Sequence, residues 1–225
     1  MVQVLEYSAK EENMTIAEKI SKIGVVPVIK LERPEEDALP LAKALSEGGL
    51  PVAEITFRAA GAEKAIKLMR ENYPDMIVGA GTVLYKEQVD RALEAGAQFI
   101  VSPGFNPKIA AYCIEKNVPI FPGCVTPTEI EAAHDLGLTT FKFFPAQQYG
   151  GLSTIKALSA PYHQFQFMPT GSISLDNLKE YLSHKSICAV GGSFMVTDKL
   201  INGKAWDEIT LICRKAADIV AEVRA

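Results

Sequence analysis

Short runs of β-branched and aromatic residues alternate along this chain with longer segments in which apolar residues recur at helical spacing. The first run, Val25–Ile29, is followed by residues 34–47, where Ala38, Leu41, Ala42 and Leu45 fall on one face of a helix before Gly48-Gly49 ends it. The same order repeats to the C-terminus. Strands that alternate with helices in this way are typical of a parallel sheet.

The pattern predicts eight strands, at residues 25–29, 52–57, 76–79, 98–101, 118–121, 139–144, 164–168 and 187–190. A helical segment follows each strand, at residues 34–47, 60–72, 86–95, 107–116, 127–136, 153–159, 175–182 and 206–223. One further helix, at residues 15–23, precedes the first strand, with Thr15 as its N-cap and Glu18 completing a capping box. These units fit a single (β/α)₈ TIM barrel with an extra N-terminal helix. The alternative, an open doubly wound sheet, is disfavoured because no G-x-G-x-x-G follows the first strand.

Length and composition agree with one globular domain. The chain has 225 residues, of which 48% are hydrophobic and 22% are charged, and no Ser-, Gly- and Pro-rich linker divides it. We assign residues 1–14 to an N-terminal tail and residues 15–225 to one catalytic barrel domain. The net charge is -4 without a strongly basic block, so we expect no nucleic-acid partner.

No apolar run reaches the roughly 18 residues of a membrane helix, and the first residues lack the apolar core of a secretion signal. The four cysteines form no C-x-x-C pair, and the three histidines lack metal-ligand spacing. We therefore expect a cytoplasmic protein with free thiols, no metal, no cofactor and no membrane partner.

One amine stands inside an aromatic run, Phe141-Lys142-Phe143-Phe144-Pro145. An ammonium loses hydration in such surroundings, so the pKa of Lys142 is expected to fall. A partly neutral lysine is a nucleophile that forms Schiff bases with carbonyl substrates. The alternative is a lysine at a strand end, with its stem buried and its head in water.

A carboxylate interrupts the second predicted strand. Alternation places Val52, Glu54 and Thr56 on one face, and if that face is the barrel interior, Glu54 must be paired or take part in chemistry. It would be either a structural partner of Arg58 or Lys142, or a proton-transferring group beside a Schiff base. Arg58 offers a planar fork for a carboxylate, but it could also be a surface arginine, and we interpret Lys30 as a surface lysine.

Further polar and glycine-rich groups follow the predicted strands, where the active face of a barrel forms. They are Gly81-Thr82, Ser102-Pro103-Gly104, Pro122-Gly123, Thr170-Gly171-Ser172 and Gly191-Gly192-Ser193. Backbone N–H groups in the last two turns would form an anion site at the position where such barrels bind phosphate. Glycine in these turns could also serve only to permit a tight bend, and Ser102 and Pro103 could simply shape theirs.

Seven blocks of sequence, in this order and spacing, resemble the bacterial KDPG/KHG aldolases from about residue 15 to the C-terminus. They are Val25-Val26-Pro27-Val28-Ile29, Glu54-Ile55-Thr56-Phe57-Arg58, Gly79-Ala80-Gly81-Thr82-Val83-Leu84, Ser102-Pro103-Gly104, Phe141-Lys142-Phe143-Phe144-Pro145-Ala146, Pro169-Thr170-Gly171 and Gly191-Gly192-Ser193. The resemblance implies a metal-independent class I aldolase, usually a homotrimer. It also implies cleavage of 2-dehydro-3-deoxy-6-phosphogluconate to pyruvate and glyceraldehyde 3-phosphate, as in the Entner–Doudoroff pathway, and of 4-hydroxy-2-oxoglutarate to pyruvate and glyoxylate.

The resemblance also assigns roles to individual residues. Lys142 would be the Schiff-base lysine and Glu54 the general acid and base. The substrate-binding residues implied are Arg58, Thr82, Pro103 and Phe144 around pyruvate, and Gly171, Ser172, Gly192 and Ser193, with Thr170 and Gly191 beside them, around the phosphate.

Three positions depart from the family pattern: Ser172 replaces a second glycine, Ala59 a threonine, and Gln147 a glutamate. These changes concern the distal substrate preference, so a 2-dehydro-3-deoxy-6-phosphogalactonate aldolase remains an alternative. Outside the aldolases, the alternatives are a phosphosugar isomerase or synthase that forms no imine, and a non-catalytic metabolite-binding barrel.

Overall fold

The computed structural model describes residues 14–225, so the tail predicted for residues 1–14 lies, except for Met14, outside the described part. The strands are β1 (Val25–Ile29), β2 (Val52–Thr56), β3 (Ile77–Gly81), β4 (Ile100–Val101), β5 (Ile120–Phe121), β6 (Thr140–Phe143), β7 (Gln166–Pro169) and β8 (Val190–Gly192). All of their pairings are parallel, which confirms the sheet type that the alternating pattern predicts.

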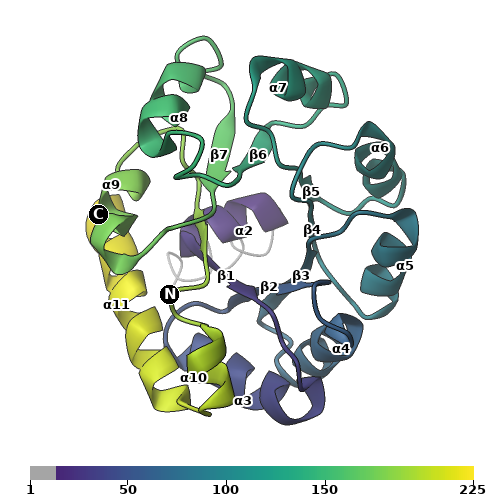
Figure 1. The fold of residues 1–225 in the computed structure, drawn as a ribbon, viewed down its shortest axis with the longest axis vertical. Helices are drawn as coiled ribbons and strands as arrows, with labels where there is room; N and C mark the ends of the chain where they lie inside the picture. The colour runs from purple at the N-terminus through teal and green to yellow at the C-terminus, as the bar shows by residue number, and fades with distance from the viewer. Residues whose placement is uncertain (1–13) are drawn as a thin grey trace, which may run out of the picture.

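Except for the first described helix, which crosses the middle of the ring, the helices lie around the outside of the strands (Figure 1). The helices are α2 (Ile16–Ile23), α3 (Pro34–Glu47), α4 (Ala62–Asn72), α5 (Lys86–Glu94), α6 (Pro107–Glu115), α7 (Pro127–His134), α8 (Gly151–Ser159), α9 (Leu175–Leu182), α10 (Asp198–Asn202) and α11 (Trp206–Arg224). All but α10 are predicted from the sequence, within two residues at most of their ends. Within residues 14–225, no helix is long and apolar enough to cross a bilayer.

The strands form two hydrogen-bonded sheets, where the sequence predicts one closed sheet. Six strands curl in the order β5-β4-β3-β2-β1-β8, and β6 pairs with β7. Isolated bridges join the two sheets, Gly123 to Lys142 on one side and Phe167 to Ile187 and Thr170 to Gly191 on the other. At the seam between β5 and β6, Pro122 has no N–H to donate, so the ladder there lacks one hydrogen bond.

The last strand is placed differently from the prediction. Gly191 and Gly192, expected in a turn, lie in β8 and pair with Val26 and Pro27 of β1. A Cβ atom on Gly191 would lie 2.3 Å from Oγ1 of Thr170. Glycine is therefore needed here because the end of β7 approaches the backbone of β8 closely.

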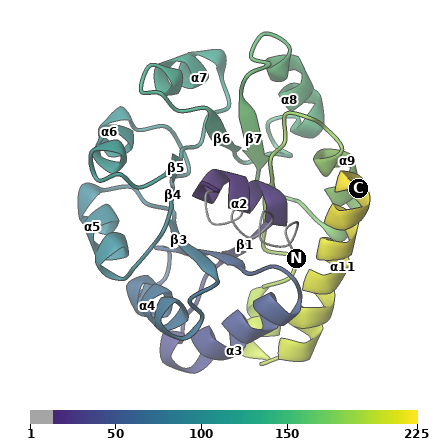
Figure 2. The ribbon, with the colours of Figure 1, turned by 180° about the vertical axis from the view of Figure 1, so that it is seen from behind.

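Alternate residues of the strands face two separate apolar clusters. The larger cluster fills the space between strands and helices. The smaller one lies on the inner face of the curled sheet and comprises Ile20, Val26, Val52, Ile77, Phe99, Val101, Phe121, Met168 and Ala189. Ile20 belongs to α2, which lies across the middle of the ring of strands (Figures 1 and 2). Helix α2 thus covers the amino-terminal ends of the strands with apolar side chains.

The local sequence determines where α2 begins and ends. Thr15 caps the helix by accepting from the Glu18 N–H, and the Glu18 side chain accepts from the Thr15 N–H, which confirms the predicted capping box. Gly24 ends the helix at φ 79°, in the left-handed region that glycine adopts without penalty. Strand β1 begins at the next residue, so the cap and the glycine together set α2 beneath the sheet.

Candidate active site

A cavity of about 440 Å³ opens at the carboxyl ends of the strands, opposite α2. All of the substrate-binding and catalytic residues predicted from the sequence line it, except Gly191, which lies behind Thr170. Another cavity, of about 470 Å³, lies beside α2 at the amino-terminal ends and contains none of these residues. Pocket size alone would therefore not identify the chemical site, whereas the convergence of the predicted polar groups does.

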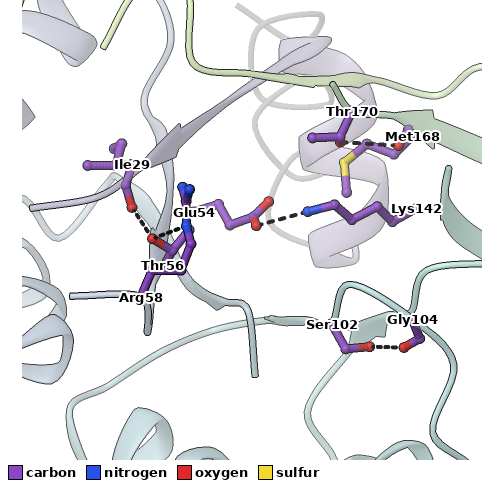
Figure 3. A network of polar contacts seen from close by, with 9 residues as sticks. All are labelled: Ile29, Glu54, Thr56, Arg58, Ser102, Gly104, Lys142, Met168 and Thr170. Carbon is purple, nitrogen blue, oxygen red and sulfur yellow. Dashed lines mark hydrogen bonds and ion pairs between the residues drawn. The ribbon is translucent and has the colours of Figure 1, made fainter. Parts of the chain in front are cut away.

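Lys142 and Glu54 meet inside the curled sheet. On β6, Phe141 and Phe143 face the outer apolar cluster, so alternation turns Lys142 inward. Its Nζ donates a hydrogen bond of 3.2 Å to Oε1 of Glu54, and the two side chains point toward each other (Figure 3). The exposed fraction is 6% for the Lys142 side chain and 0% for that of Glu54. The interpretation of Lys142 as a lysine with its head in water is therefore wrong.

The space around Glu54 depends on a missing side chain. Gly81, at the end of β3, lies next to the carboxylate, and a Cβ atom there would be 2.3 Å from Oε1. The second carboxylate oxygen, Oε2, is buried and has no hydrogen-bond partner among the described residues. A buried unpaired carboxylate oxygen is costly unless a ligand or water satisfies it, so Oε2 is available to a molecule in the cavity.

Arg58 is oriented by a side chain that the sequence analysis did not select. Its Nε donates to Oγ1 of Thr56 at 3.2 Å, and that hydroxyl donates in turn to the Ile29 carbonyl at 2.8 Å (Figure 3). Thr56 lies on the same face of β2 as Glu54, which is the signal that could have identified it. With Nε occupied, the outer nitrogens of the guanidinium remain for a carboxylate.

Two lining residues hold backbone conformations that favour glycine. Thr82 has φ 57° and Ser172 has φ 58°, and a left-handed conformation costs about 1–2 kcal/mol for a residue with a Cβ. Such strain clusters at functional sites, where the surrounding structure holds it in place. The same conformation at Ser172 would suit the glycine that this residue replaces in the family pattern.

The remaining predicted residues form the walls. The Phe144 ring centroid lies 5.3 Å from Nζ of Lys142, within the range of a cation–π contact. Pro103 is held close to the next loop, since a Cβ atom on Gly123 would be 2.1 Å from the Pro103 carbonyl oxygen. Val28, Ile173 and Phe194 also line the cavity. Their apolar side chains carried no chemical signal in the sequence.

The turn after β7 presents free donors. Within the described chain, the backbone N–H groups of Gly171, Ser172 and Ile173 donate to no protein acceptor, and Gly171 has φ 107°. Gly192 and Ser193, from the end of β8, line the same part of the cavity. Successive free N–H groups form a concave site for an anion.

The cysteine thiols do not line this cavity. Burial raises the pKa of Cys113, Cys124 and Cys213 to about 12, so these thiols stay protonated near neutral pH. All four cysteines are free, as expected. Among residues 14–225, no three His, Cys, Asp or Glu side chains are grouped so that they could hold a metal ion. Among the described residues that line the cavity, the amine is that of Lys142.

The sequence is similar to known proteins over most of its length. The model of the family "KDPG and KHG aldolase" matches residues 16–212. The 2-dehydro-3-deoxy-phosphogluconate aldolase of Haemophilus influenzae is 49% identical over 205 residues, covering 91% of this chain and 96% of that protein. The KHG/KDPG aldolase of Escherichia coli K12 is 42% identical, with coverage of 91% and 96%.

Among solved structures, the KDPG aldolase of Legionella pneumophila, described with pyruvate captured as a covalent carbinolamine intermediate, superposes with a TM-score of 0.86. Its sequence is 37% identical, and the match covers 90% of this chain and 98% of that one. The extent of these matches and the convergence of the predicted residues lead to one conclusion. This chain belongs to the KDPG and KHG aldolase family.

Proposed function

We propose that this protein is a class I aldolase that cleaves 2-dehydro-3-deoxy-6-phosphogluconate to pyruvate and glyceraldehyde 3-phosphate. It would also cleave 4-hydroxy-2-oxoglutarate to pyruvate and glyoxylate. The observation that carries the proposal is the buried amine of Lys142, 3.2 Å from the Glu54 carboxylate inside a cavity open to solvent. The names of the related proteins support the same activity. The proposal includes a role in the Entner–Doudoroff pathway, as the family resemblance implies.

Imine formation begins with a proton transfer that the short contact permits. Oε1 of Glu54 accepts a proton from Nζ of Lys142, which leaves a neutral amine with a free lone pair. The amine adds to the C2 carbonyl of the substrate and forms a carbinolamine. Loss of the C2 hydroxyl as water, with a proton returned from Glu54, gives a protonated imine.

The protonated imine then accepts the electron pair of the C3–C4 bond. A base removes the proton of the C4 hydroxyl, the C3–C4 bond breaks, and the aldehyde leaves while an enamine remains on Lys142. Glu54 takes this proton, directly or through one water, and afterwards delivers a proton to C3. Water then hydrolyses the imine, which releases pyruvate and restores the amine.

The walls of the cavity would hold the two ends of the substrate. The outer nitrogens of Arg58 bind the C1 carboxylate in a bidentate manner. Thr82, Pro103 and Phe144 surround the three carbons that become pyruvate. The free N–H groups of the turn after β7, together with Gly192 and Ser193 and backed by Thr170 and Gly191, bind the phosphate.

The proposal also covers the closure of the barrel, the oligomeric state and the location in the cell. The two sheets act as one closed (β/α)₈ barrel within a single catalytic domain over residues 15–225, which the bridges at both seams support. The protein forms a homotrimer, as the family resemblance implies, and light scattering of the purified protein tests this. It resides in the cytoplasm, where reducing conditions keep its cysteines free.

Borohydride reduction in the presence of pyruvate tests the chemistry. The full-length protein should gain a stable adduct on the peptide that contains Lys142, because borohydride reduces the imine to a secondary amine. The control is Lys156→Met, which removes a lysine of α8 outside the cavity and should leave the adduct unchanged. Active protein that gives no adduct on Lys142 would disprove the proposal.

A substrate panel tests the distal preference. Pyruvate release is measured from 2-dehydro-3-deoxy-6-phosphogluconate, its C4 epimer, 4-hydroxy-2-oxoglutarate, and the unphosphorylated sugar acid. We expect the highest kcat/KM for the phosphogluconate. A higher kcat/KM for the C4 epimer would instead assign the protein to phosphogalactonate cleavage.

A further inference from the structure

A smaller cavity, of about 260 Å³, adjoins the active-site cavity at the ends of β1 and β8 and is called the second cavity from here on. The two cavities share Val28, Arg58 and Ser193 as lining residues. The second adds Lys30, which directly follows β1, and Asp198, the first residue of α10. The sequence analysis interpreted Lys30 as a surface lysine and did not predict α10, so this cavity is a finding of the tertiary structure.

Two of the three basic side chains around the two cavities already have a partner in the proposed substrate. The basic side chains that line them are Lys142, Arg58 and Lys30. In the proposed reaction, Lys142 becomes the imine and Arg58 binds the C1 carboxylate. Among the described residues that line the two cavities, Lys30 is then the remaining cation without a partner in the substrate, which has one further anionic group.

That group is a phosphate that carries close to two negative charges at neutral pH. The N–H groups of Gly171, Ser172 and Ile173 offer it hydrogen bonds without a net charge. A dianion gains most from a donor that is itself charged. The chain therefore contains donors for the phosphate in one turn and a complementary charge beside Ser193.

The ammonium of Lys30 is held by an exposed ion pair and can change partner. This ammonium contacts the Glu32 carboxylate, and the exposed fractions of the two side chains are 35% and 56%. The hydrogen bond with Glu32 and the nearby charges of Glu32 and Asp198 raise the pKa of Lys30 above its ordinary 10.5, so the amine is charged at neutral pH. An ion pair this exposed is weak, and the flexible stem of lysine can move its charge to a stronger partner.

We propose that Lys30 is a specificity-determining residue that binds the terminal phosphate of phosphorylated 2-keto-3-deoxy acids from the second cavity. Glu32 competes with the phosphate for the same ammonium. This inference rests on the proposed aldolase function, and it concerns only the preference for phosphorylated over unphosphorylated substrates.

The first test removes the charge with Lys30→Met, which keeps the length of the stem. KM for 2-dehydro-3-deoxy-6-phosphogluconate should rise about tenfold with little change in kcat, since a hydrogen bond to a charged group is lost. KM for the unphosphorylated acid should stay the same. Lys30→Arg should retain the wild-type preference, and Lys67→Met, which removes an exposed helix lysine that pairs with Glu71, is the matched control.

The second test removes the competitor. Glu32→Gln should lower KM for the phosphorylated substrate by about two- to threefold, because an exposed ion pair no longer holds the ammonium. KM would then fall in Glu32→Gln and rise in Lys30→Met. A merely structural role of Lys30 would not produce these opposite shifts in KM.

Two outcomes would overturn the inference. One is an unchanged preference for the phosphorylated substrate in Lys30→Met, and the other is an equal loss with both substrates. In either case, trapping of pyruvate on Lys142 in the same variant would leave the aldolase function intact. Failure of trapping in the wild-type protein would contradict the proposed function itself.

Discussion

The two ends of the strand ring differ in how their side chains are satisfied. At the amino-terminal end, α2 packs Ile20 against apolar side chains such as Val52 and Phe99, and this cluster is buried. At the carboxyl end, the inward-facing positions of the same strands hold Glu54 and Lys142, with one carboxylate oxygen left unpaired. The inner face at the amino-terminal end is covered by apolar packing, whereas the carboxyl end presents a carboxylate oxygen that a ligand can satisfy.

The two ends also differ in what they contribute to the stability of the fold. Apolar burial under α2 is favourable in proportion to its area. The carboxyl end holds a desolvated ion pair and the left-handed residues Thr82 and Ser172, which are features that destabilise a fold. A substitution at the first end should therefore affect mainly unfolding, and one at the second mainly catalysis.

The largest effect is expected from Lys142→Arg. A guanidinium fills the site and keeps its charge, but it is not deprotonated in proteins and cannot form the imine. We expect kcat/KM for pyruvate release to fall about 10⁴-fold or more, as when other covalent nucleophiles are removed. Substantial remaining activity would favour a phosphosugar enzyme that needs no imine.

Glu54→Gln should have the next largest effect. It keeps the volume of the side chain and removes its ability to carry protons, so kcat should fall about 10³-fold. Glu47→Gln on the exposed face of α3 is the control and should leave kcat unchanged. The role of Glu54 as acid and base would be refuted by a wild-type kcat in Glu54→Gln.

Ile20→Ala tests the opposite end. Removing this buried side chain from the inner cluster should lower the free energy of unfolding by about 2–5 kcal/mol. Ile114→Ala, at an exposed position of α6, should change it by less than about 0.5 kcal/mol. Urea unfolding measures both, while kcat/KM well below the unfolding temperature should stay at the wild-type value. A selective loss of kcat in Ile20→Ala would contradict the separation of the two ends.

Gly81→Ala should lower activity although it replaces neither Lys142 nor Glu54. The new methyl would displace the Glu54 carboxylate, and misplacement of a catalytic group by about 1 Å costs about 10²-fold in rate. Gly104→Ala, in the nearby loop after β4, has no atom within 4 Å of the new Cβ and is the matched control. Equal kinetics of the two variants would show that Gly81 does not position Glu54.

Thr15→Ala should have the smallest effect. Loss of the N-cap of α2 should destabilise the protein by about 1 kcal/mol near neutral pH. Hydrogen bonds from Thr15 lower the pKa of Glu18 below its ordinary 4.5. The capping box therefore stabilises the fold above that pH, and its contribution is lost as the pH falls through the lowered value. Denaturation curves of both proteins should differ less at acid pH than at neutral pH, because acid removes the bond from the Thr15 hydroxyl to the Glu18 carboxylate but leaves the N-cap bond from the Glu18 N–H.

Much of the fold was predictable because hydrophobic spacing and capping residues are local features of the sequence. The helical spacing from residue 34 to residue 47 and the capping box of Thr15 and Glu18 appear in the structure as predicted. Helix α10 was missed because five residues are too short to show a helical period. The end of β8 was misplaced because Gly191 and Gly192 signal a turn locally, while their pairing partners lie in β1.

The candidate site divides in the same way. Alternation along β2 already placed Glu54 on one face with Val52 and Thr56, and the aromatic run already marked Lys142. The positions that shape their surroundings carried no such signal. The reason for a glycine at position 81 becomes visible only when the Glu54 side chain lies beside it. Lys30 looks like any exposed lysine until β1 and α10 enclose a cavity next to it.

By itself, the sequence determined which residues can react and which residues of a strand share a face, because side-chain chemistry and strand periodicity are properties of neighbouring residues. Only the tertiary structure decided that the amine and the carboxylate, 88 positions apart, lie 3.2 Å from each other. That distance depends on the curl of the sheet and on the packing of side chains from distant segments. No short stretch of the chain encodes it.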